Sequence, residues 1–342
     1  MRVLVTGGAG YVGSHVVDLL IREGHAVTVI DSLENGHREA VHPAAQLIHG
    51  NCGDPALLDH VLGDVLGKAP FDAAMHFAAY IEAGESMVDP GRFFVNNTGR
   101  ALVLLDRLIA HGVTRFLFSS TAATYGNPVY TPIDEAHPQL PTNAYGYSKL
   151  LVEGALDWMS RLRGLSCASL RYFNVAGCGD ELGEDHAPES HLIPLVLEVA
   201  QGKRASIKIF GTDYPTPDGT AVRDYIHVLD LARAHAIALA ALGDGKRLAY
   251  NLGNGAGYSV RQVVEAARRV TGHAIPVEEV PRRAGDPAVL IASSQKIQAE
   301  LGWQPAHADL DAIIRSAWLW RQRYPQGYAT PGQSPNWNHH VP

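Results

Sequence analysis

A glycine-rich turn joins the first apolar segment of the chain to the first segment with helical periodicity. Residues 2–6 have the pattern of a buried strand, residues 11–23 that of a helix, and Gly8, Gly10 and Gly13 in the turn have the spacing GxGxxG. Glycine at such positions permits a tight turn, close approach of the backbone to a pyrophosphate and close packing of helix on strand. The helix N-terminus offers unpaired N–H groups and a positive dipole end to phosphates. This segment therefore predicts a dinucleotide-binding βαβ unit.

An acidic residue supports this interpretation and indicates which dinucleotide is bound. Asp31 ends the second predicted strand, residues 26–31, and lies 18 residues beyond Gly13. A separation of about 20 residues is typical of the carboxylate that holds the adenosine ribose. Such a carboxylate accepts a hydrogen bond from a ribose 2′-hydroxyl and repels a 2′-phosphate, so NAD is favoured over NADP. The alternative is a glycine turn that binds no ligand.

Strand-length apolar runs alternate with helical patterns through the first half of the chain. The further strands are expected at residues 71–77 and 115–119, and the long helices at residues 89–111 and 145–162. This alternation predicts an α/β fold with a doubly wound parallel sheet, a Rossmann fold.

The pattern changes after about Asn174. Loops rich in Gly, Pro and acidic residues are expected at 177–191 and 211–219, with short strands and helices after them. We expect a smaller α/β lobe from which the chain crosses back to the main sheet. The predicted division is 1–174 for the mainly NAD-binding domain, 175–330 for the mainly substrate-binding lobe and 331–342 for an irregular tail.

Composition excludes several classes of protein. The chain of 342 residues has a formal net charge of -7 and no basic cluster, which argues against nucleic-acid binding. Its three cysteines form no CxxC pair, so neither a disulfide framework nor a structural zinc site is expected. The first residues do not resemble a signal peptide, and no apolar run approaches the roughly 18 residues of a membrane span. We therefore expect a cytoplasmic protein with no membrane partner.

Tyr145 and Lys149 form a YxxxK motif on a predicted helix. Residues four apart on a helix lie on one face, with Cβ atoms roughly 5–6 Å apart. An ammonium beside a phenol favours the phenolate, which an ordinary tyrosine pKa of about 10 makes scarce at neutral pH. The motif also fits an ordinary surface pair. Thr121, however, follows the strand at 115–119 and lies at the strand end where open α/β sheets bind ligands.

These motifs, in this order, resemble the extended short-chain dehydrogenases. Five further blocks are similar to the UDP-glucose 4-epimerases of that family: RYFN at 171–174, GTDYPT at 211–216, DGT at 218–220, VRDYIHV at 222–228 and RRAGD at 282–286. The resemblance runs from residue 1 to about residue 328. It implies interconversion of UDP-glucose and UDP-galactose by transient oxidation at C4 with tightly bound NAD.

The resemblance also implies residue roles. Tyr145 would be the base, Lys149 would assist it, and Thr121 would orient the sugar 4-hydroxyl. The cofactor-binding set would be Gly7, Gly10, Tyr11, Val12, Gly13, Asp31, Asn35, Asn51, Cys52, Phe77, Ala78, Ala79, Asn96, Ser119, Tyr145, Lys149 and Tyr172. The UDP-sugar would be bound by Thr121, Asn174, His191, Leu192, Phe210, Arg223, Arg283, Asp286 and Leu290. The family is typically homodimeric through the helices at 89–111 and 145–162.

The chain departs from the family at several of these positions. Asn51 and Cys52 stand where many relatives carry an aspartate and an aliphatic residue near the adenine, and Ile81 stands where some carry a lysine. His191 replaces an asparagine found in some relatives. Leu290 falls where the family varies a residue of the sugar-pocket wall, and its intermediate size implies weaker action on N-acetylated sugars.

Other functions remain open from the sequence. The chain could be a 4-epimerase for another UDP-sugar, such as UDP-N-acetylglucosamine or a UDP-pentose. A nucleotide-sugar 4,6-dehydratase would need an Asp-Glu pair where Ala122 and Ala123 follow Thr121. A non-enzymatic NAD-sensing protein would have no use for the Tyr-Lys-Thr set. No metal is expected, because the 17 histidines show no HExxH spacing, and we interpret His186 and His191 as solvated loop residues.

Overall fold

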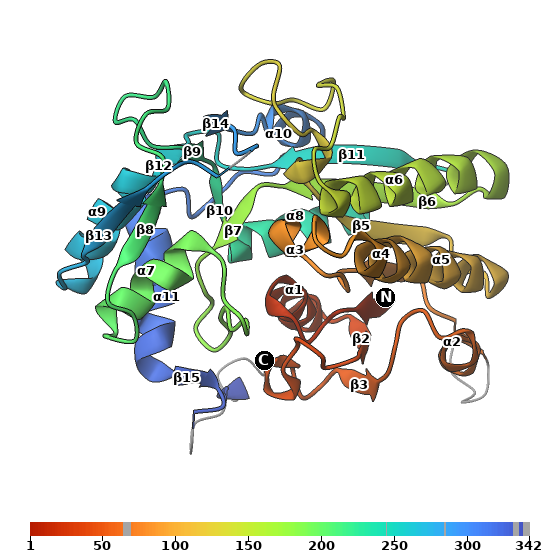
Figure 1. The fold of residues 1–342 in the computed structure, drawn as a ribbon. Helices are drawn as coiled ribbons and strands as arrows, with labels where there is room; N and C mark the ends of the chain where they lie inside the picture. The colour runs from red at the N-terminus through yellow and green to blue at the C-terminus, as the bar shows by residue number, and fades with distance from the viewer. Residues whose placement is uncertain (64–69, 244, 284, 331–334, 338–342) are drawn as a thin grey trace.

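A seven-stranded parallel sheet forms the centre of the molecule (Figure 1). The computed structural model describes residues 1–342 except 64–69, 244, 284, 331–334 and 338–342. The strand order is β11-β6-β5-β4-β1-β2-β3, and every neighbouring pair is parallel. Its strands are β1 (Arg2–Thr6), β2 (Ala26–Asp31), β3 (Gln46–His49), β4 (Ala73–His76), β5 (Arg115–Thr121), β6 (Ser166–Tyr172) and β11 (Arg247–Leu252). The order of the first six strands is that of the doubly wound fold, so the predicted fold class is confirmed.

Alternating side chains of the strands pack against helices on both faces of this sheet. Val3 and Val5 of β1 join one core cluster, while Leu4 joins the cluster on the opposite face, as the two-residue period of a strand requires. The first cluster includes helices α1 (Tyr11–Arg22), α8 (Val228–Ala241) and α10 (Gln295–Leu301). The second includes α2 (Pro55–Leu62), α5 (Arg100–Ala110) and α6 (Ala144–Arg163).

A smaller body of helices and short strands lies beside the carboxyl ends of the main strands (Figure 1). Helices α7 (Leu192–Ala200), α9 (Val260–Thr271) and α11 (Leu310–Arg323) share its apolar core. The short strands are β7 (Asn174–Ala176) with β10 (Tyr225–His227), β8 (Ile207–Phe210) with β13 (Val277–Val280), β9 (Val222–Arg223) between β12 (Tyr258–Ser259) and β14 (Val289–Leu290), and β15 (Pro325–Tyr328). After helix α8, strand β11 pairs with β6 and so belongs to the main sheet. Much of the predicted tail, 331–342, lies outside the described residues.

The helix predicted at 89–111 is present as one continuous helical stretch with a π-helical segment in its middle. It consists of α4 (Pro90–Phe93), a π-helical segment η3 (Phe94–Gly99) and α5. Within the π-helical segment, Asn97 holds the backbone of Tyr80 through both ends of its amide: Oδ1 accepts from the Tyr80 N–H at 2.9 Å and Nδ2 donates to the carbonyl at 2.9 Å. Segments of this kind are often found at functional sites. The remaining short helices are α3 (Ala83–Ser86), η1 (Arg38–Ala40) and η4 (Ala122–Thr124).

Across the described ranges, no helix combines the length and the apolar character needed to cross a lipid bilayer.

Candidate active site

The glycine turn between β1 and α1 is closely packed against backbone. Gly7 has a φ of +77°, and a Cβ there would lie 2.4 Å from the Ala78 nitrogen; a Cβ on Gly13 would lie 2.1 Å from the Gly7 carbonyl oxygen. Gly8 instead faces the side chain of Val29 in β2. The turn and its helix contact therefore depend on Gly7 and Gly13, while Gly8 permits packing on the neighbouring strand.

The N-terminus of α1 is suited to bind phosphates. Gly10 is the N-cap residue and supplies no side-chain cap, so the N–H groups of the first helical turn are not satisfied by a capping side chain. One cavity is lined by Gly10, Tyr11, Val12 and Gly13. An uncapped helix N-terminus that opens into a cavity fits the pyrophosphate of a dinucleotide.

Asp31 has a structural role that the sequence did not indicate. Its two carboxylate oxygens accept hydrogen bonds from the backbone N–H groups of Ala9 and Leu33, both at 2.9 Å. Leu33 has a φ of 55°, so the second bond stabilises an uncommon backbone conformation. A carboxylate has about four acceptor positions, so Asp31 retains capacity for ribose hydroxyls.

One cavity of about 340 Å³ runs along the carboxyl ends of the central strands. Every residue of the predicted cofactor set lines it: Gly7, Gly10, Tyr11, Val12, Gly13, Asp31, Asn35, Asn51, Cys52, Phe77, Ala78, Ala79, Asn96, Ser119, Tyr145, Lys149 and Tyr172. Thr121, Asn174 and His191 of the substrate set line it as well. The fold thus brings together residues from distant parts of the sequence, and their contact with a cofactor stays a prediction.

Tyr145 lies partly buried at the start of α6, where its side chain is hydrogen-bonded to Thr121. Burial raises the pKa of the Tyr145 phenol to about 12, against the opposing effect of the Thr121 hydrogen bond, and the nearby charge of Glu82 raises it further. The Thr121 hydroxyl oxygen also accepts from the Ala123 N–H at 3.1 Å, which fixes its position at the end of β5. The two hydroxyl groups therefore form one preorganised pair.

Lys149 lies one helical turn beyond Tyr145 and is buried. Its Nζ donates to the carbonyl oxygen of Ser119 at 2.8 Å, and burial lowers the pKa of the ammonium to about 7. The pKa of the Tyr145 phenol is raised and that of the Lys149 ammonium is lowered, so both groups are shifted toward their neutral forms. The physical reason is that burial disfavours both charged forms. A further positive charge in the cavity is needed to favour the phenolate.

The remaining substrate residues form a second group. The Arg283 guanidinium lies 3.8 Å from the centre of the Phe210 ring, and Arg223 forms an ion pair with Asp286. Leu290 of β14 is in register with Arg223 of β9, and Leu192 begins α7. None of these six residues is among the described residues that line the 340 Å³ cavity. Asn174 connects the cavity, which it lines, to this second group. Its N–H donates to the carbonyl of Asp224, the residue after Arg223, at 3.0 Å.

Sequence reasoning missed two buried residues next to Tyr145 and Lys149. Asn97 Nδ2 donates to the Ser148 hydroxyl at 3.2 Å, and that hydroxyl donates to the Tyr145 carbonyl at 2.7 Å, so the π-helical segment holds α6. His76, at the end of β4, is hydrogen-bonded to Thr6, and burial together with the Lys149 charge lowers its pKa to about 3. Neither residue has a motif that distinguishes it from ordinary polar core.

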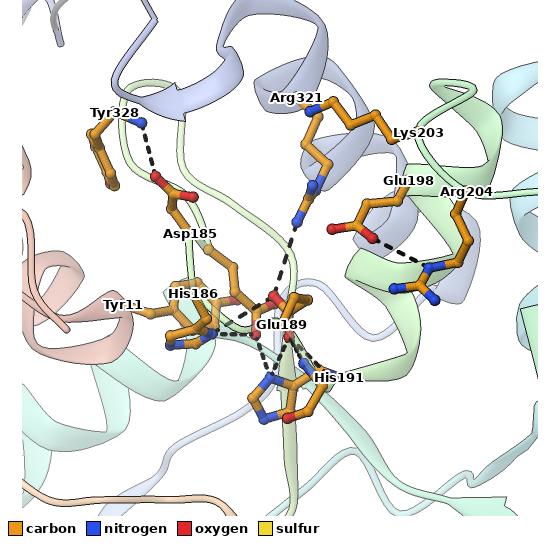
Figure 2. Close-up of polar contacts among 12 residues, drawn as sticks. Tyr11, Asp185, His186, Glu189, His191, Glu198, Lys203, Arg204, Arg321 and Tyr328 are labelled. Atoms are coloured by element: carbon orange, nitrogen blue, oxygen red, sulfur yellow. Dashed lines mark hydrogen bonds and ion pairs between the residues drawn. The ribbon is translucent and has the colours of Figure 1, made fainter.

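The interpretation of His186 and His191 as solvated loop residues is only partly correct, since their side chains are 19% and 38% exposed. Their Nδ1 atoms face the buried carboxylates of Glu184 and Glu189 (Figure 2). Burial lowers the pKa of His186, but the two nearby glutamate carboxylates outweigh it and raise the pKa to about 9. The same balance raises the pKa of His191 well above its ordinary value. The alternation of acids and histidines over residues 184–191 was the available signal, and loop composition concealed the burial.

The comparison with known proteins agrees with the geometry of this site. The model of the NAD dependent epimerase/dehydratase family matches residues 3–253. The chain is 54% identical over 318 residues to a UDP-glucose 4-epimerase of Corynebacterium glutamicum, covering 93% of this chain and 95% of that protein. It is 51% identical to that of Streptococcus mutans, covering 96% and 99%. The crystal structure of UDP-glucose 4-epimerase from Brucella ovis in complex with NAD superposes with a TM-score of 0.88 at 43% identity, covering 93% and 97%.

The family model matches well over half of the chain, and the relatives share about half of its residues along nearly their whole length. This chain belongs to the NAD dependent epimerase/dehydratase family.

Proposed function

We propose that the chain interconverts UDP-glucose and UDP-galactose by epimerization at C4 of the sugar, with NAD as a tightly held cofactor. The observation that carries the proposal is the hydrogen-bonded pair of Tyr145 and Thr121, which lines the same cavity as the glycine turn and the N-terminus of α1. Relatives named UDP-glucose 4-epimerases, matched over nearly the whole chain, support the substrate.

Tyr145 would remove the proton of the sugar 4-hydroxyl and return it at the end of the cycle. Bound NAD supplies a hydride acceptor, and then a hydride donor, at C4, together with a positive charge that favours the phenolate. Thr121 would hold the 4-hydroxyl against Tyr145, and Lys149 would stabilise the ionised phenol. Oxidation and reduction cancel over one turnover, so no external oxidant is needed.

Epimerization also requires firm contacts to the nucleotide and loose contacts to the sugar, because the oxidised sugar must present its other face before reduction. Arg223, Arg283 and Phe210 offer charge and an aromatic surface suited to the uridine and the diphosphate. Their ion-pair and stacking partners hold them in place. Asn174 would connect this group to the cavity.

The competing functions have weaker support. A 4,6-dehydratase eliminates water with an acid and a base placed after the Thr121 position, but η4 carries Ala122 and Ala123 there. A protein that only senses NAD would not need a tyrosine hydrogen-bonded to a threonine in the cavity wall. Action on another UDP-sugar is the nearest alternative, since Leu290 decides the size of the group accepted at C2.

The direct test uses protein purified without added NAD. We expect denatured protein to release NAD, and native protein to convert UDP-galactose into UDP-glucose, followed by NMR, with no added cofactor. UDP-N-acetylglucosamine should react more slowly, because the proposal places Leu290 in the wall beside C2 of the sugar, where its branched side chain would take space from an acetamido group. Release of NADP, or formation of a 4-keto-6-deoxy sugar, would contradict the proposal.

We also propose a homodimer formed through α6 and its neighbour α5. Tyr147, Leu151, Trp158 and Leu162 are exposed on α6, with Trp158 and Leu162 at 62% and 72%. Their spacing places them on one face of the helix. Val95 and Leu102, from η3 and α5 alongside, are exposed too, and the two helices lie side by side (Figure 1). When two chains pair through these faces, α5 and α6 of each chain together form a four-helix bundle.

Light scattering should report the mass of two chains for the wild type. Trp158→Glu buries a charge at this interface, and we expect the mass of one chain at the same concentration. Leu319→Glu is the matched control, because Leu319 is 58% exposed on α11, in the other part of the molecule. A wild-type mass of one chain, or equal dissociation of both variants, would exclude this interface.

A further inference from the structure

Four side chains with metal-binding atoms converge beside the cavity. Glu184, His186, Glu189 and His191 each contribute one ligand atom, and these atoms all lie within 4.8 Å of one another (Figure 2). We propose that these four residues bind one divalent first-row transition metal ion, with zinc as the best match, and that the ion holds the cavity wall in place.

The distances suit a single four-coordinate ion. Zinc bonds of about 2.0–2.2 Å to nitrogen and oxygen in a tetrahedron separate the ligand atoms by about 3.3–3.6 Å. In the cluster, His191 Nδ1 lies 3.0 Å from an oxygen of each glutamate, and His186 Nδ1 lies 3.4 Å from Glu184 and 3.8 Å from Glu189. Small rotations of the side chains would bring all four to bonding distance.

Two atoms of the cluster have no hydrogen bond although both are buried. They are Nδ1 of His186 and Oε2 of Glu189, and the Glu189 side chain is only 5% exposed. The carboxylate oxygens nearest to His186 Nδ1 belong to Glu184 at 3.4 Å and Glu189 at 3.8 Å, and the Arg321 guanidinium lies 4.0 Å from Glu189 Oε2. Buried polar atoms are normally satisfied, so these two indicate a missing partner, and both face the centre of the cluster.

The kinds of ligand select the metal. Imidazole nitrogen suits zinc, copper, iron and nickel, whereas magnesium and calcium require an oxygen shell. Four protein ligands leave no open position, which is the arrangement of a structural site rather than a catalytic one. The cluster is short in sequence, so one ion would fix eight consecutive residues, 184–191.

The position of the cluster gives the ion a role. Glu184, His186 and His191 line the cavity, and His191 is also the N-cap residue of α7. The His186 ring lies edge-on to the Tyr11 ring of the glycine turn at 6.2 Å, and the Tyr11 hydroxyl donates to the Gly177 carbonyl at 2.5 Å. The ion would therefore join α7 and the loop at 177–191 to the wall beside α1, without contact to Tyr145.

The experiment measures metal content, independently of enzyme activity. Protein without an affinity tag is treated with a chelator, exchanged into zinc, freed of excess metal and analysed by mass spectrometry. We expect about one zinc ion per chain and a rise of several degrees in the melting temperature when zinc is restored, since a ligand of the native state stabilises it. Cobalt(II) in place of zinc should give the visible absorption of a tetrahedral site.

Substitution of the ligands identifies the site. His186→Gln and Glu189→Gln should each weaken zinc binding at least about 100-fold, because loss even of a group behind a ligand costs 10–100-fold. His111→Gln is the matched control, since His111 pairs with Asp59 at 3.0 Å on the surface. A second control replaces His339 and His340, which lie outside the described residues. Both controls should retain zinc.

Two outcomes would overturn the proposal. One is wild-type protein that retains no zinc and shows no shift in melting temperature; the cluster would then be a network of protonated histidines and carboxylates only. The other is zinc that persists in folded His186→Gln and Glu189→Gln proteins, which would place the ion elsewhere. Circular dichroism verifies folding, so a misfolded variant cannot be mistaken for a lost ligand.

Discussion

Replacing Tyr145 with phenylalanine should lower turnover of UDP-galactose about 10²–10⁴-fold, the range typical of a positioned acid–base group. The ring, its burial and its packing remain, and only the hydroxyl that is hydrogen-bonded to Thr121 is removed. Binding of the cofactor should change little, because the glycine turn, the N-terminus of α1 and Asp31 are unaltered in this variant. The measurements are kcat and KM, together with the NAD released by the denatured variant.

Tyr147→Phe provides the matched control. Tyr147 lies two residues further along α6, is 48% exposed and packs its ring against Phe94. Loss of its hydroxyl should leave turnover unchanged. A Tyr145→Phe enzyme with nearly wild-type turnover would exclude Tyr145 as the base, and an equal loss in both variants would point to damage to α6 rather than to the chemistry.

The fold could be predicted because its signals are local. The buried strand at 2–6, the glycine turn and the helix after it determine a βαβ unit, and the alternation of strands and helices then requires a parallel sheet. The helix predicted at 89–111 is present, but its π-helical segment could not be predicted, for a non-local reason. Asn97 bonds the backbone of Tyr80, 17 residues earlier, and no periodicity along the helix contains that contact.

The candidate site likewise has residues whose position follows from local signals and others whose position depends on non-local contacts. The cofactor residues follow strand ends, and strand ends of a parallel sheet meet at one edge, so their convergence follows from topology. The acid–histidine cluster could not be recognised in this way, because its loop looks polar and solvated. Its burial depends on Tyr11 and on Arg321 of α11, far away in the sequence. The charge states of Tyr145 and Lys149 could not be predicted from the sequence either, since the burial of Lys149 is a property of the assembled core.

Replacing Gly13 with alanine should remove most NAD binding. A Cβ at Gly13 would lie 2.1 Å from the Gly7 carbonyl oxygen, and backbone on both sides leaves no flexible side chain to yield. Either the turn or the start of α1 must move, and overpacking of this kind costs about 1–3 kcal/mol of folding free energy. The same movement displaces the N–H groups that would hold the pyrophosphate.

The loss of affinity can be estimated from those bonds. A hydrogen bond to a charged group contributes about 1.5–3 kcal/mol, so losing two of them raises the Kd for NAD about 10²–10⁴-fold. Calorimetry on cofactor-free protein measures the Kd, and urea unfolding measures the free energy. Gly84→Ala is the control, since a Cβ at this exposed position in α3 meets nothing within 4 Å. If Gly13→Ala bound NAD as tightly as Gly84→Ala, the pyrophosphate would not lie on the N-terminus of α1, because no cofactor held there could tolerate a displaced turn.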